Sequence, residues 1–245
     1  MQETQGPDIA FLQKRIVPIF QRLRTYSRVR VDGLEHVPTA GPALLVANHT
    51  GWLGLDYAFT ALSVWERLQR LVRGMAHPAW FANAATATFA RRCGIVRISK
   101  DAIKQQMQAG ELVLMFPEGE KGAFRPGSDY QLEEFARGFV RIALETSVPV
   151  VPVCILGGEE ANPVGTRIQS YEELVNLKGG LPIPKNLIPK PVKWRIRFLP
   201  PLNLAGRGPA DAGDPDCVHA VADATRDSIQ RQLRQMIVER GHPYL

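Results

Sequence analysis

Short apolar runs alternate with stretches of helical periodicity along most of the chain, a pattern typical of α/β domains. The apolar runs have the length of buried strands, and the segments between them repeat apolar residues at helical spacing. This order predicts a single α/β domain with a mixed, mostly parallel sheet flanked by helices. Strands are expected at residues 27–31, 43–47, 94–98, 112–116, 148–156 and 192–199, and helices at 57–72, 80–92, 100–109, 132–146 and 217–240.

Proline and glycine residues interrupt the alternation of strands and helices in three places. Pro149 and Pro152 interrupt the run 148–156, and because proline cannot donate to a sheet ladder, this strand is expected at an edge or a bulge. Residues 179–191 carry too much proline and glycine for a helix or a strand, so they are expected to form an exposed connection. Residues 206–213 are interpreted as a linker.

Residues 1–28 are expected to form an N-terminal unit that precedes the main domain at residues 29–245. From Ile9 onward apolar residues recur at helical spacing and basic residues fall mostly on other faces, which predicts a basic amphipathic helix with a kink at Pro18. Two interpretations are open: the helix packs on its own domain, or it lies in a membrane interface. The opening residues do not resemble a secretory signal, and no apolar run reaches the ~18 residues of a membrane span.

Composition narrows the range of partners without choosing one. The chain is 45% hydrophobic, which suits a packed core, and its formal charge is +6. The basic excess suits a membrane surface, a nucleic acid or a phosphorylated substrate. Cys93, Cys154 and Cys217 are far apart and lack metal-ligand spacing, so we expect reduced thiols in a cytosolic compartment.

The stretch LLVANHTGWLGLD places His49 and Asp56 just after the apolar run 43–47. Seven residues span about 10 Å in a helix and more than roughly 20 Å in a strand, whereas a carboxylate that orients an imidazole lies about 3 Å from it. The two side chains therefore meet only if the chain folds back through a loop, for which Gly51 and Gly54 supply backbone freedom. In the alternative interpretation, Asp56 is an N-cap and His49 bonds nearby backbone.

A second polar group follows the apolar run 112–116, where FPEG presents Glu118 past a strand end. The carboxyl ends of parallel strands meet at one edge of an α/β sheet, and such sheets commonly place their sites there. We therefore expect His49, Asp56 and Glu118 to share one pocket.

Three ordered blocks, NHTGWLGLD, FPEG and VPVVPV, resemble the glycerolipid acyltransferase family, which includes lysophosphatidic acid and glycerol-3-phosphate acyltransferases. The resemblance covers residues 29–156 and implies that family's fold. Members usually carry H-x-x-x-x-D, and here two more residues separate His49 from Asp56. The longer spacing, together with FPEGEKG and GGEEANP, is closer to the branch that resembles monoacylglycerol and diacylglycerol acyltransferases and their bacterial relatives.

The resemblance implies O-acyl transfer from acyl-CoA or acyl carrier protein (acyl-ACP) to the hydroxyl of a lysophospholipid, such as lysophosphatidic acid, or of a monoacylglycerol-like lipid. A thioester is already activated, so only the acceptor hydroxyl needs a base. By the resemblance, His49 is the general base, and Asp56 holds its tautomer and stabilises the imidazolium. No metal ion or tightly held cofactor is implied.

The same resemblance assigns the binding residues. Glu118 and Gly119 match the acceptor-binding block, where the carboxylate bonds a hydroxyl and the glycine allows close backbone approach. Lys121 stands where an arginine usually follows FPEG, and it attracts a phosphate as a point charge. Arg97, after CGIV, lies near the place of another basic residue of the family. Asn48 either bonds a carbonyl or stabilises the loop.

Other classes of protein fit part of the pattern. A noncatalytic membrane- or lipid-binding protein on the same fold would use the basic helix but would not require His49, Asp56 and Glu118 together. A nucleic-acid reader is disfavoured because the arginines are scattered, and metal hydrolysis because no second histidine follows at ligand spacing. The sequence thus predicts a cytoplasmic enzyme, peripheral on the inner face of a membrane; it leaves acceptor, acyl length, donor and oligomeric state open.

Overall fold

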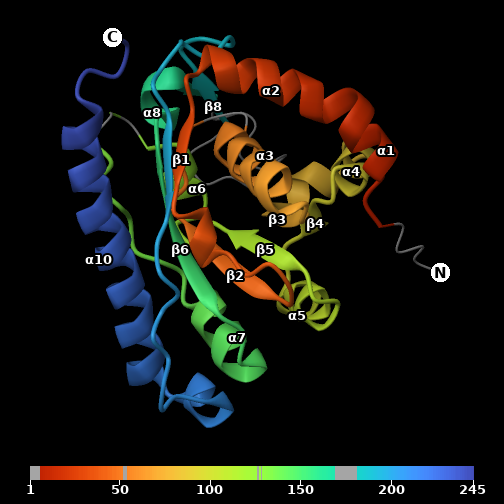
Figure 1. Cartoon of the computed structure of the whole chain (residues 1–245), viewed down its shortest axis with the longest axis vertical. Helices are drawn as coiled ribbons and strands as arrows, with labels where there is room; N and C mark the ends of the chain where they lie inside the picture. Colours follow the sequence, from red (N-terminus) through yellow and green to blue (C-terminus); the bar gives the residue numbers. More distant parts are fainter. Residues whose placement is uncertain (1–5, 52–53, 126, 128, 169–180) are drawn as a thin grey trace.

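The computed structural model describes residues 6–51, 54–125, 127, 129–168 and 181–245. Its centre is a seven-stranded sheet in the order β1-β9-β6-β2-β5-β3-β4 (Figure 1). The strands from β6 to β4 are parallel, whereas β9 runs antiparallel to β6 and carries β1 parallel to itself. The predicted mixed, mostly parallel sheet is confirmed. Its strands are β1 (Arg30–Asp32), β2 (Ala43–Ala47), β3 (Val72–Ala76), β4 (Val96–Arg97), β5 (Leu112–Met115), β6 (Val150–Leu156) and β9 (Arg195–Phe198).

The strand at residues 43–47 has the predicted bounds, but β3 was not predicted, because the helix expected at 57–72 overlaps its start. That helix ends at Leu68. Gln69 takes the left-handed conformation at φ +54° and donates its N–H to the carbonyl oxygen of Trp65 at 2.9 Å. This cap turns the chain back along the sheet as β3.

β6 lies inside the sheet between β2 and β9, so the prediction of an edge position or a bulge was wrong. The reason is that both prolines join the sheet through their carbonyl oxygens, which do not require an N–H. Leu44 donates its N–H to the carbonyl oxygen of Pro149 at 3.0 Å, and Leu199 donates to that of Pro152 at 2.9 Å. The antiparallel ladder with β9 covers only residues 153–156. The missing N–H of Pro152 therefore falls just before the residues that this ladder uses.

Helices cover both faces of the sheet: α2 and α3 lie on one face, and α5, α7 and α10 on the other (Figure 1). Successive residues of β2 point to opposite layers, so Leu44 packs with α7 and α10 while Leu45 packs with α3. The helices are α2 (Val17–Tyr26), α3 (Leu55–Leu68), α4 (Ala84–Arg92), α5 (Lys100–Gln108), α6 (Glu120–Ala123), α7 (Gly138–Thr146), α8 (Gly158–Ala161) and α10 (Pro215–Arg240).

α7 begins six residues later than the expected helix 132–146. Contacts from elsewhere in the chain hold this segment outside a helix. A helix that began at Leu132 would use the N–H of Ala136, but this group donates to the carbonyl oxygen of Pro117 at 2.9 Å. The N–H of Leu132 donates to Oε1 of Gln230 at 2.8 Å, and the N–H of Glu133 donates to Oε2 of Glu118 at 2.8 Å. The segment before α7 is thus fixed by tertiary contacts and not by its own periodicity.

The N-terminal helical segment consists of α1 (Ile9–Phe11), a π-helical turn (Leu12–Ile16) and α2. The π turn directly precedes the first turn of α2, which contains Pro18, so the helix is irregular where the kink was expected. Phe20 and Leu23 of α2 pack against the core layer that contains α3. The first interpretation of this helix, packing on its own domain, therefore accounts for much of its apolar face. In the described residues, none of the helices has both the length and the apolar character that a membrane span requires.

A separate two-stranded sheet pairs β7 (Val164–Ile168) with β8 (Leu181–Pro184). The exposed connection expected at 179–191 therefore contains a strand, and its first two residues lie outside the described residues. The chain between β8 and β9 is irregular, as expected. The linker expected at 206–213 ends in a 3₁₀ turn, Pro209–Gly213.

Candidate active site

The site begins at the end of β2, where the side chain of Asn48 bonds the main chain of β6 in place of the β2 backbone. Asn48 is fully buried and pairs with the main chain of Ile155: Nδ2 donates to the carbonyl oxygen at 2.9 Å, and Oδ1 accepts from the N–H at 2.7 Å. Both functions of the amide are thus used within the protein. Of its two predicted roles, the structure shows the stabilisation of the loop.

The next residue, His49, meets Asp56 across the loop. Nδ1 of His49 lies 2.5 Å from Oδ2 of Asp56, whose side chain is fully buried. The loop closes through Gly51 and Gly54 at φ +85° and +66°, which confirms the predicted fold-back. Gly54 is the N-cap of α3, so the alternative in which Asp56 is the N-cap was wrong.

Asp56 is held by main-chain donors on both sides of the loop. Oδ2 also accepts from the N–H of Thr50 at 3.0 Å, and Oδ1 accepts from the N–H of Tyr57 at 2.7 Å. The carboxylate lies in the first turn of α3, where the helix dipole favours negative charge. A carboxylate so placed accepts Nδ1–H of His49, and this leaves the lone pair of the imidazole on Nε2.

The imidazole ring is oriented by stacking as well as by Asp56. The ring of His49 lies 4.2 Å from that of Phe116 at an interplanar angle of 16°. The side chain remains 23% exposed, and no hydrogen bond joins Nε2 to another described residue. Phe116, the residue just after β5, therefore fixes the plane of the ring, and the imidazole stays partly exposed.

Glu118 lies beneath the histidine and holds its backbone. Oε1 accepts from the N–H of His49 at 2.9 Å, and Oε2 accepts from the N–H of Glu133 and from Nη2 of Arg125. Burial raises the pKa of Glu118, while the Arg125 charge and the two backbone donors lower it. The structure thus brings Glu118 to His49 and Asp56, with both carboxylate oxygens bonded within the protein. Its predicted contact with an acceptor hydroxyl stays a prediction.

Sequence reasoning missed Arg125, a buried cation that joins two strand ends. Its Nη1 donates to Oε1 of Glu159 at 2.7 Å, and its Nη2 donates to Glu118. Glu159 follows β6 in α8. Burial raises the pKa of Glu159 to about 7, although the hydrogen bond and charge of Arg125 lower it. The signal in the sequence is only the pair of carboxylates, each just past a strand that borders β2, because buried charges require a partner.

The adjacent residue, Glu160, has its own buried partners. Its carboxylate accepts from Arg240 at the end of α10 and from the phenol of Tyr130, with 2.5 Å between Oη and Oε2. The same phenol oxygen accepts from the N–H of Gly157 at 2.5 Å. Burial and the nearby carboxylates raise the pKa of Tyr130, so the phenol stays protonated and donates to Glu160. α8 is therefore tied to both α10 and the segment before α7.

The remaining predicted binding residues are exposed. Gly119 is at φ +59°, where only glycine fits readily, and no neighbour lies within 4 Å of a Cβ built on it. Lys121 lies on α6, and Arg97 on the edge strand β4, three strands away from β2. Neither cation has an ion-pair partner among the described residues. The structure brings neither of them into contact with His49.

Two further kinds of chemical group, metal ligands and thiols, bear on the chemistry of the described residues. Those residues contain no group of three or more His, Cys, Asp or Glu side chains that could hold a metal ion. Cys93, Cys154 and Cys217 are free, as expected, and burial raises the pKa of Cys93 to about 11. A reactive thiolate is therefore not available at Cys93.

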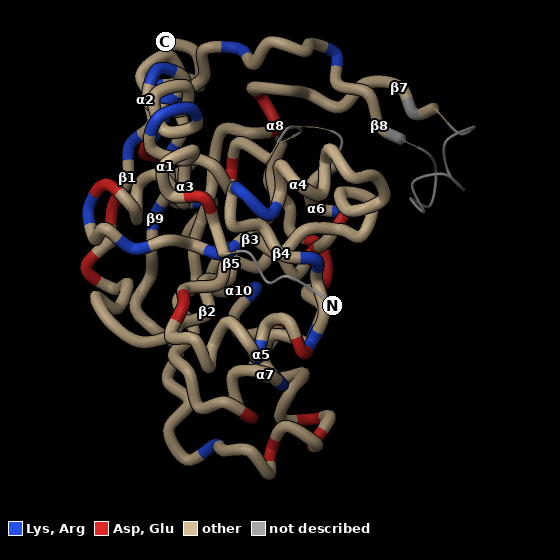
Figure 2. Tube along the Cα trace, turned by 90° about the vertical axis from the view of Figure 1, so that its right-hand side faces the viewer, with Lys and Arg blue, Asp and Glu red and all other residues tan. Residues whose placement is uncertain are grey.

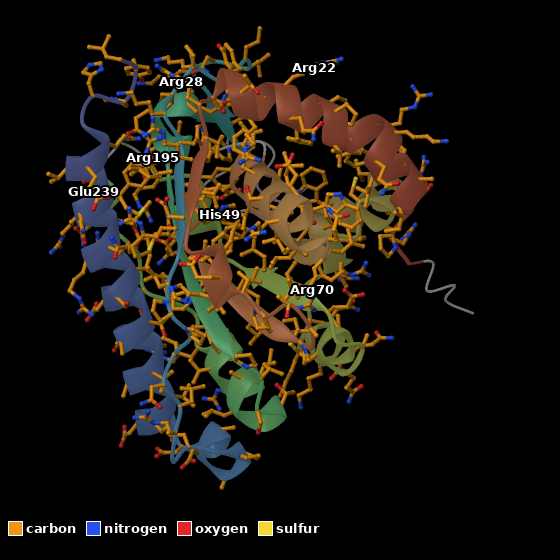
Figure 3. All side chains as sticks on the ribbon, viewed as in Figure 1. Arg22, Arg28, His49, Arg70, Arg195 and Glu239 are labelled. Atoms are coloured by element: carbon orange, nitrogen blue, oxygen red, sulfur yellow. The ribbon has the colours of Figure 1, made fainter. Side chains whose placement is uncertain are left out.

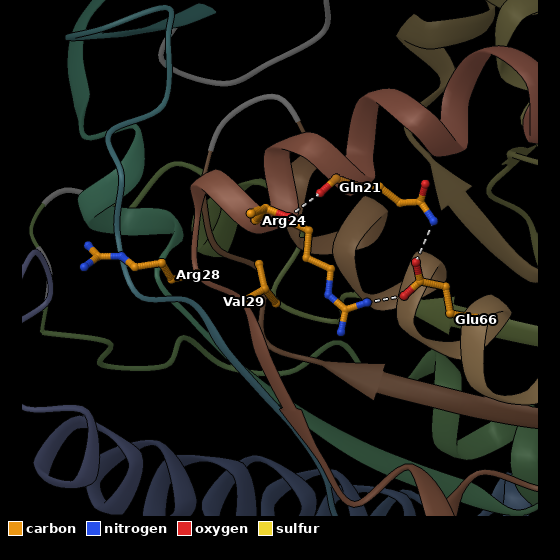
Figure 4. Close-up of a pocket in the computed structure, with 6 residues that line it drawn as sticks. Gln21, Arg24, Arg28, Val29 and Glu66 are labelled. Atoms are coloured by element: carbon orange, nitrogen blue, oxygen red, sulfur yellow. Dashed lines mark hydrogen bonds and ion pairs between the residues drawn. The ribbon is translucent and has the colours of Figure 1, made fainter.

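A cavity of about 360 Å³ opens between α2 and α3 (Figure 4). Gln21 and Arg24 of α2 line it, and both bond the carboxylate of Glu66 on α3. Its main polar groups are thus already paired. His49, which Figure 3 shows nearer the middle of the sheet, does not line this cavity.

Comparisons with known proteins find a family model and relatives that cover much of the chain. A family model described as Acyltransferase matches residues 28–156, just over half of the chain. An uncharacterized protein from Mycobacterium tuberculosis is 34% identical over 229 residues, which cover 89% of this chain and 64% of that protein. The chain thus spans less than two thirds of the length of such relatives.

Other matches carry functional names. The 1-acyl-sn-glycerol-3-phosphate acyltransferase alpha of Mus musculus is 25% identical over 85% of this chain and 65% of that protein. Phytyl ester synthase 1 of Arabidopsis thaliana is 25% identical over 69% of this chain and 24% of that protein. The crystal structure of the 1-acyl-sn-glycerophosphate (LPA) acyltransferase from Thermotoga maritima has a TM-score of 0.61 and 18% identity, and covers 92% of this chain and 80% of that one. The two chains share a fold.

Proposed function

Since this chain belongs to the Acyltransferase family, we propose that it transfers a fatty acyl group from acyl-CoA or acyl-ACP to a hydroxyl group of a glycerolipid. The observation that carries the proposal is the contact between His49 and Asp56. Nδ1 of the imidazole lies 2.5 Å from a fully buried carboxylate, while the ring keeps an exposed edge. An imidazole held in this way is a base with Nε2 directed to the substrate.

The chemistry needs no nucleophile from the protein. Nε2 of His49 takes the proton of the acceptor hydroxyl as the hydroxyl oxygen attacks the thioester carbonyl carbon. The tetrahedral intermediate then collapses, the C–S bond breaks, and the leaving thiolate receives the proton that His49 has carried. Asp56 stabilises the imidazolium between these two steps, because its buried carboxylate bonds Nδ1–H throughout.

We propose a lysophospholipid as the acceptor, lysophosphatidic acid first, with a monoacylglycerol-like lipid as the second candidate. The name of the mouse relative supports the phosphorylated acceptor. The name of the Arabidopsis phytyl ester synthase supports an acceptor without phosphate. Lys121 and Arg97 are the cations we assign to a phosphate group, and both are exposed. These acceptors reside in bilayers, so we also propose that the protein works peripherally on a membrane.

The experiment offers labelled acyl-CoA and acyl-ACP, with lysophosphatidic acid, other lysophospholipids and monoacylglycerol in parallel, to the wild type and to His49→Ala. His219→Ala is the matched control, because His219 is exposed on α10. Product from the wild type and from His219→Ala, with a loss of about 10²- to 10⁴-fold in His49→Ala, supports the base. If the wild type binds lipid but acylates no acceptor, the enzyme is rejected in favour of a lipid-binding protein.

A further inference from the structure

Two consecutive aliphatic side chains project into solvent between β8 and β9. Leu187 is 72% exposed and Ile188 is 78% exposed. Single exposed aliphatic residues are ordinary on a protein surface, but an adjacent pair at the tip of one segment points to a binding surface. We use the name tip segment for residues 185–190.

The tip segment is held in place by hydrogen bonds. Nδ2 of Asn186 donates to the carbonyl oxygen of Ile188 at 2.6 Å and to that of Ala161 at 2.9 Å. Asn162 donates to the carbonyl oxygen of Asn186 at 3.0 Å, and the N–H of Lys190 donates to Ala161 at 2.9 Å. These bonds tie the segment to the end of α8, so its exposed pair is presented by a fixed backbone.

The segment that carries the exposed pair has charge of one sign. Lys185 and Lys190 flank it, and residues 181–195 contain four basic and no acidic residues. The α2 side of this surface is similar, since residues 9–30 contain six basic and no acidic residues. Figure 2 shows Lys and Arg along α2 and along the chain that runs from β8 towards the C-terminus, at the same end of the molecule.

Arg28 connects these two basic segments. Its Nη2 donates to the carbonyl oxygen of Pro191 at 2.6 Å and to that of Tyr244 at 2.9 Å. Figure 3 shows Arg28 and Arg22 at the end of the molecule where α2 lies. The apolar side chains Phe20 and Leu23 of α2 are already packed against the core. α2 still exposes Ile19 and Tyr26 by about half, and the two more exposed side chains of the tip segment add to this apolar surface.

We propose that Leu187 and Ile188 insert into the interfacial region of an anionic lipid bilayer, while Lys185, Lys190 and the basic residues of α2 contact the head groups. The inference rests on the proposed function, because an enzyme whose acceptor is a lipid has to contact the bilayer that holds this acceptor. A pair of aliphatic residues is far smaller than a stable protein interface, and uniform basic charge suits a surface of anionic head groups. α8 bonds the tip segment through Ala161 and packs on Thr50 through Gly158, so the docked segment is linked to the loop of His49.

The test is sedimentation of the full chain with vesicles, in the absence of any acyl donor. Vesicles of phosphatidylcholine with phosphatidylglycerol are compared with vesicles of phosphatidylcholine alone. The variant is Leu187→Asp with Ile188→Asp, and the matched control is Val238→Asp, because Val238 is 81% exposed on α10. We expect the double variant to lose about tenfold or more in affinity for the anionic vesicles, and the control to bind like the wild type.

Three outcomes overturn the proposal: wild-type binding that ignores anionic lipid, double-variant binding equal to the wild type, or an equal loss in the control. Sedimentation without vesicles reports the oligomeric state, and a dimer that the double substitution dissociates while vesicle binding persists assigns the pair to a second copy. Vesicle binding is measured without an acyl donor, so it does not depend on turnover. If the wild type acylates no lipid in the separate acyl-transfer experiment, the proposed function is rejected and the docking result stands. A thermal unfolding midpoint equal to the wild type shows that each variant is folded.

Discussion

Gly158 packs directly on the main chain of Thr50, the residue that follows the candidate base. A Cβ built on Gly158 would lie 2.4 Å from the carbonyl oxygen of Thr50, and one built on Gly51 would lie 2.9 Å from the α carbon of Gly158. Both neighbours are backbone, so neither can move aside as a flexible side chain would. The loop of His49 and the start of α8 therefore approach so closely that Gly51 and Gly158 have no room for a side chain.

The substitution Gly158→Ala should displace this loop. We expect kcat to fall by about tenfold or more and the free energy of unfolding to fall by about 1–3 kcal/mol, because the added methyl group forces the two backbones apart. Steady-state acyl transfer and urea unfolding measure the two effects. Gly213→Ala is the matched control, since no atom lies within 4 Å of its Cβ position. Equal behaviour of the two variants would contradict the packing argument.

Asp56→Asn should leave the fold intact and lower kcat by about 10²- to 10⁴-fold. The amide no longer favours Nδ1–H over the other tautomer of His49, nor does it stabilise an imidazolium. The measurement is kcat across the pH range, with Asp101→Asn as control, because Asp101 is likewise the second residue of a helix but is exposed. Full activity in Asp56→Asn would remove Asp56 from the mechanism.

Arg125→Met should destabilise the protein strongly, since it leaves Glu118 and Glu159 buried without their cation. Breaking a buried pair costs about 3–5 kcal/mol, whereas an exposed pair is worth about 0–1 kcal/mol. Arg137→Met is the control, because Arg137 pairs with Glu134 on the surface at 2.5 Å. Urea unfolding of both variants gives the comparison. A loss in Arg125→Met no larger than in the control would show that the buried pair is dispensable.

The pH dependence of stability should carry a contribution from Glu159. Its pKa is about 7 in the folded protein, against 4.5 for an ordinary glutamate, so between these values the folded state keeps a proton that the unfolded state has released. Raising the pH through this window therefore lowers the free energy of unfolding by up to about 1.4 kcal/mol per pH unit, and the effect is complete above pH ~7.

Glu159→Gln should remove this contribution. The measurement is urea unfolding at intervals from about pH 5 to pH 8 for the wild type and the variant. The difference between them should change with pH below ~7 and level off above it. Glu134→Gln, at an exposed carboxylate, should run parallel to the wild type. A difference for Glu159→Gln that does not vary with pH would show that Glu159 is ionised throughout.

The fold was predictable where local pattern and tertiary context agree. The strand at 43–47 is apolar throughout and buried on both faces, so its periodicity was sufficient. The late start of α7 was not predictable, because side chains such as Gln230, roughly a hundred residues away, hold the segment before it outside a helix. The position of β6 was wrongly predicted from Pro152 for the same reason. A proline is tolerated there only because the ladder with β9 begins at the next residue.

Part of the candidate site could likewise be predicted from the sequence, and part of it could not. Gly51 and Gly54 mark in the sequence the turn that brings His49 to Asp56, and chain geometry alone required that turn. The network beneath it leaves no such mark. Arg125 reads as one of many arginines until the fold places two buried carboxylates around its guanidinium. Burial is a property of the assembled chain, so the partners of a buried charge are hard to read from spacing.

The amide of Asn48 has a consequence for how such loops vary. Asn48 fixes one end of the loop to β6, and Asp56 at the other end lies within the first turn of α3, so the positions of His49 and Asp56 are set by β6 and α3 and not by the number of residues between them. Doubling the length of a flexible loop costs only about 0.6 kcal/mol in closure entropy. Insertions between the two anchors are therefore thermodynamically cheap, and a chain with two extra residues in this motif can keep the same contact between base and carboxylate.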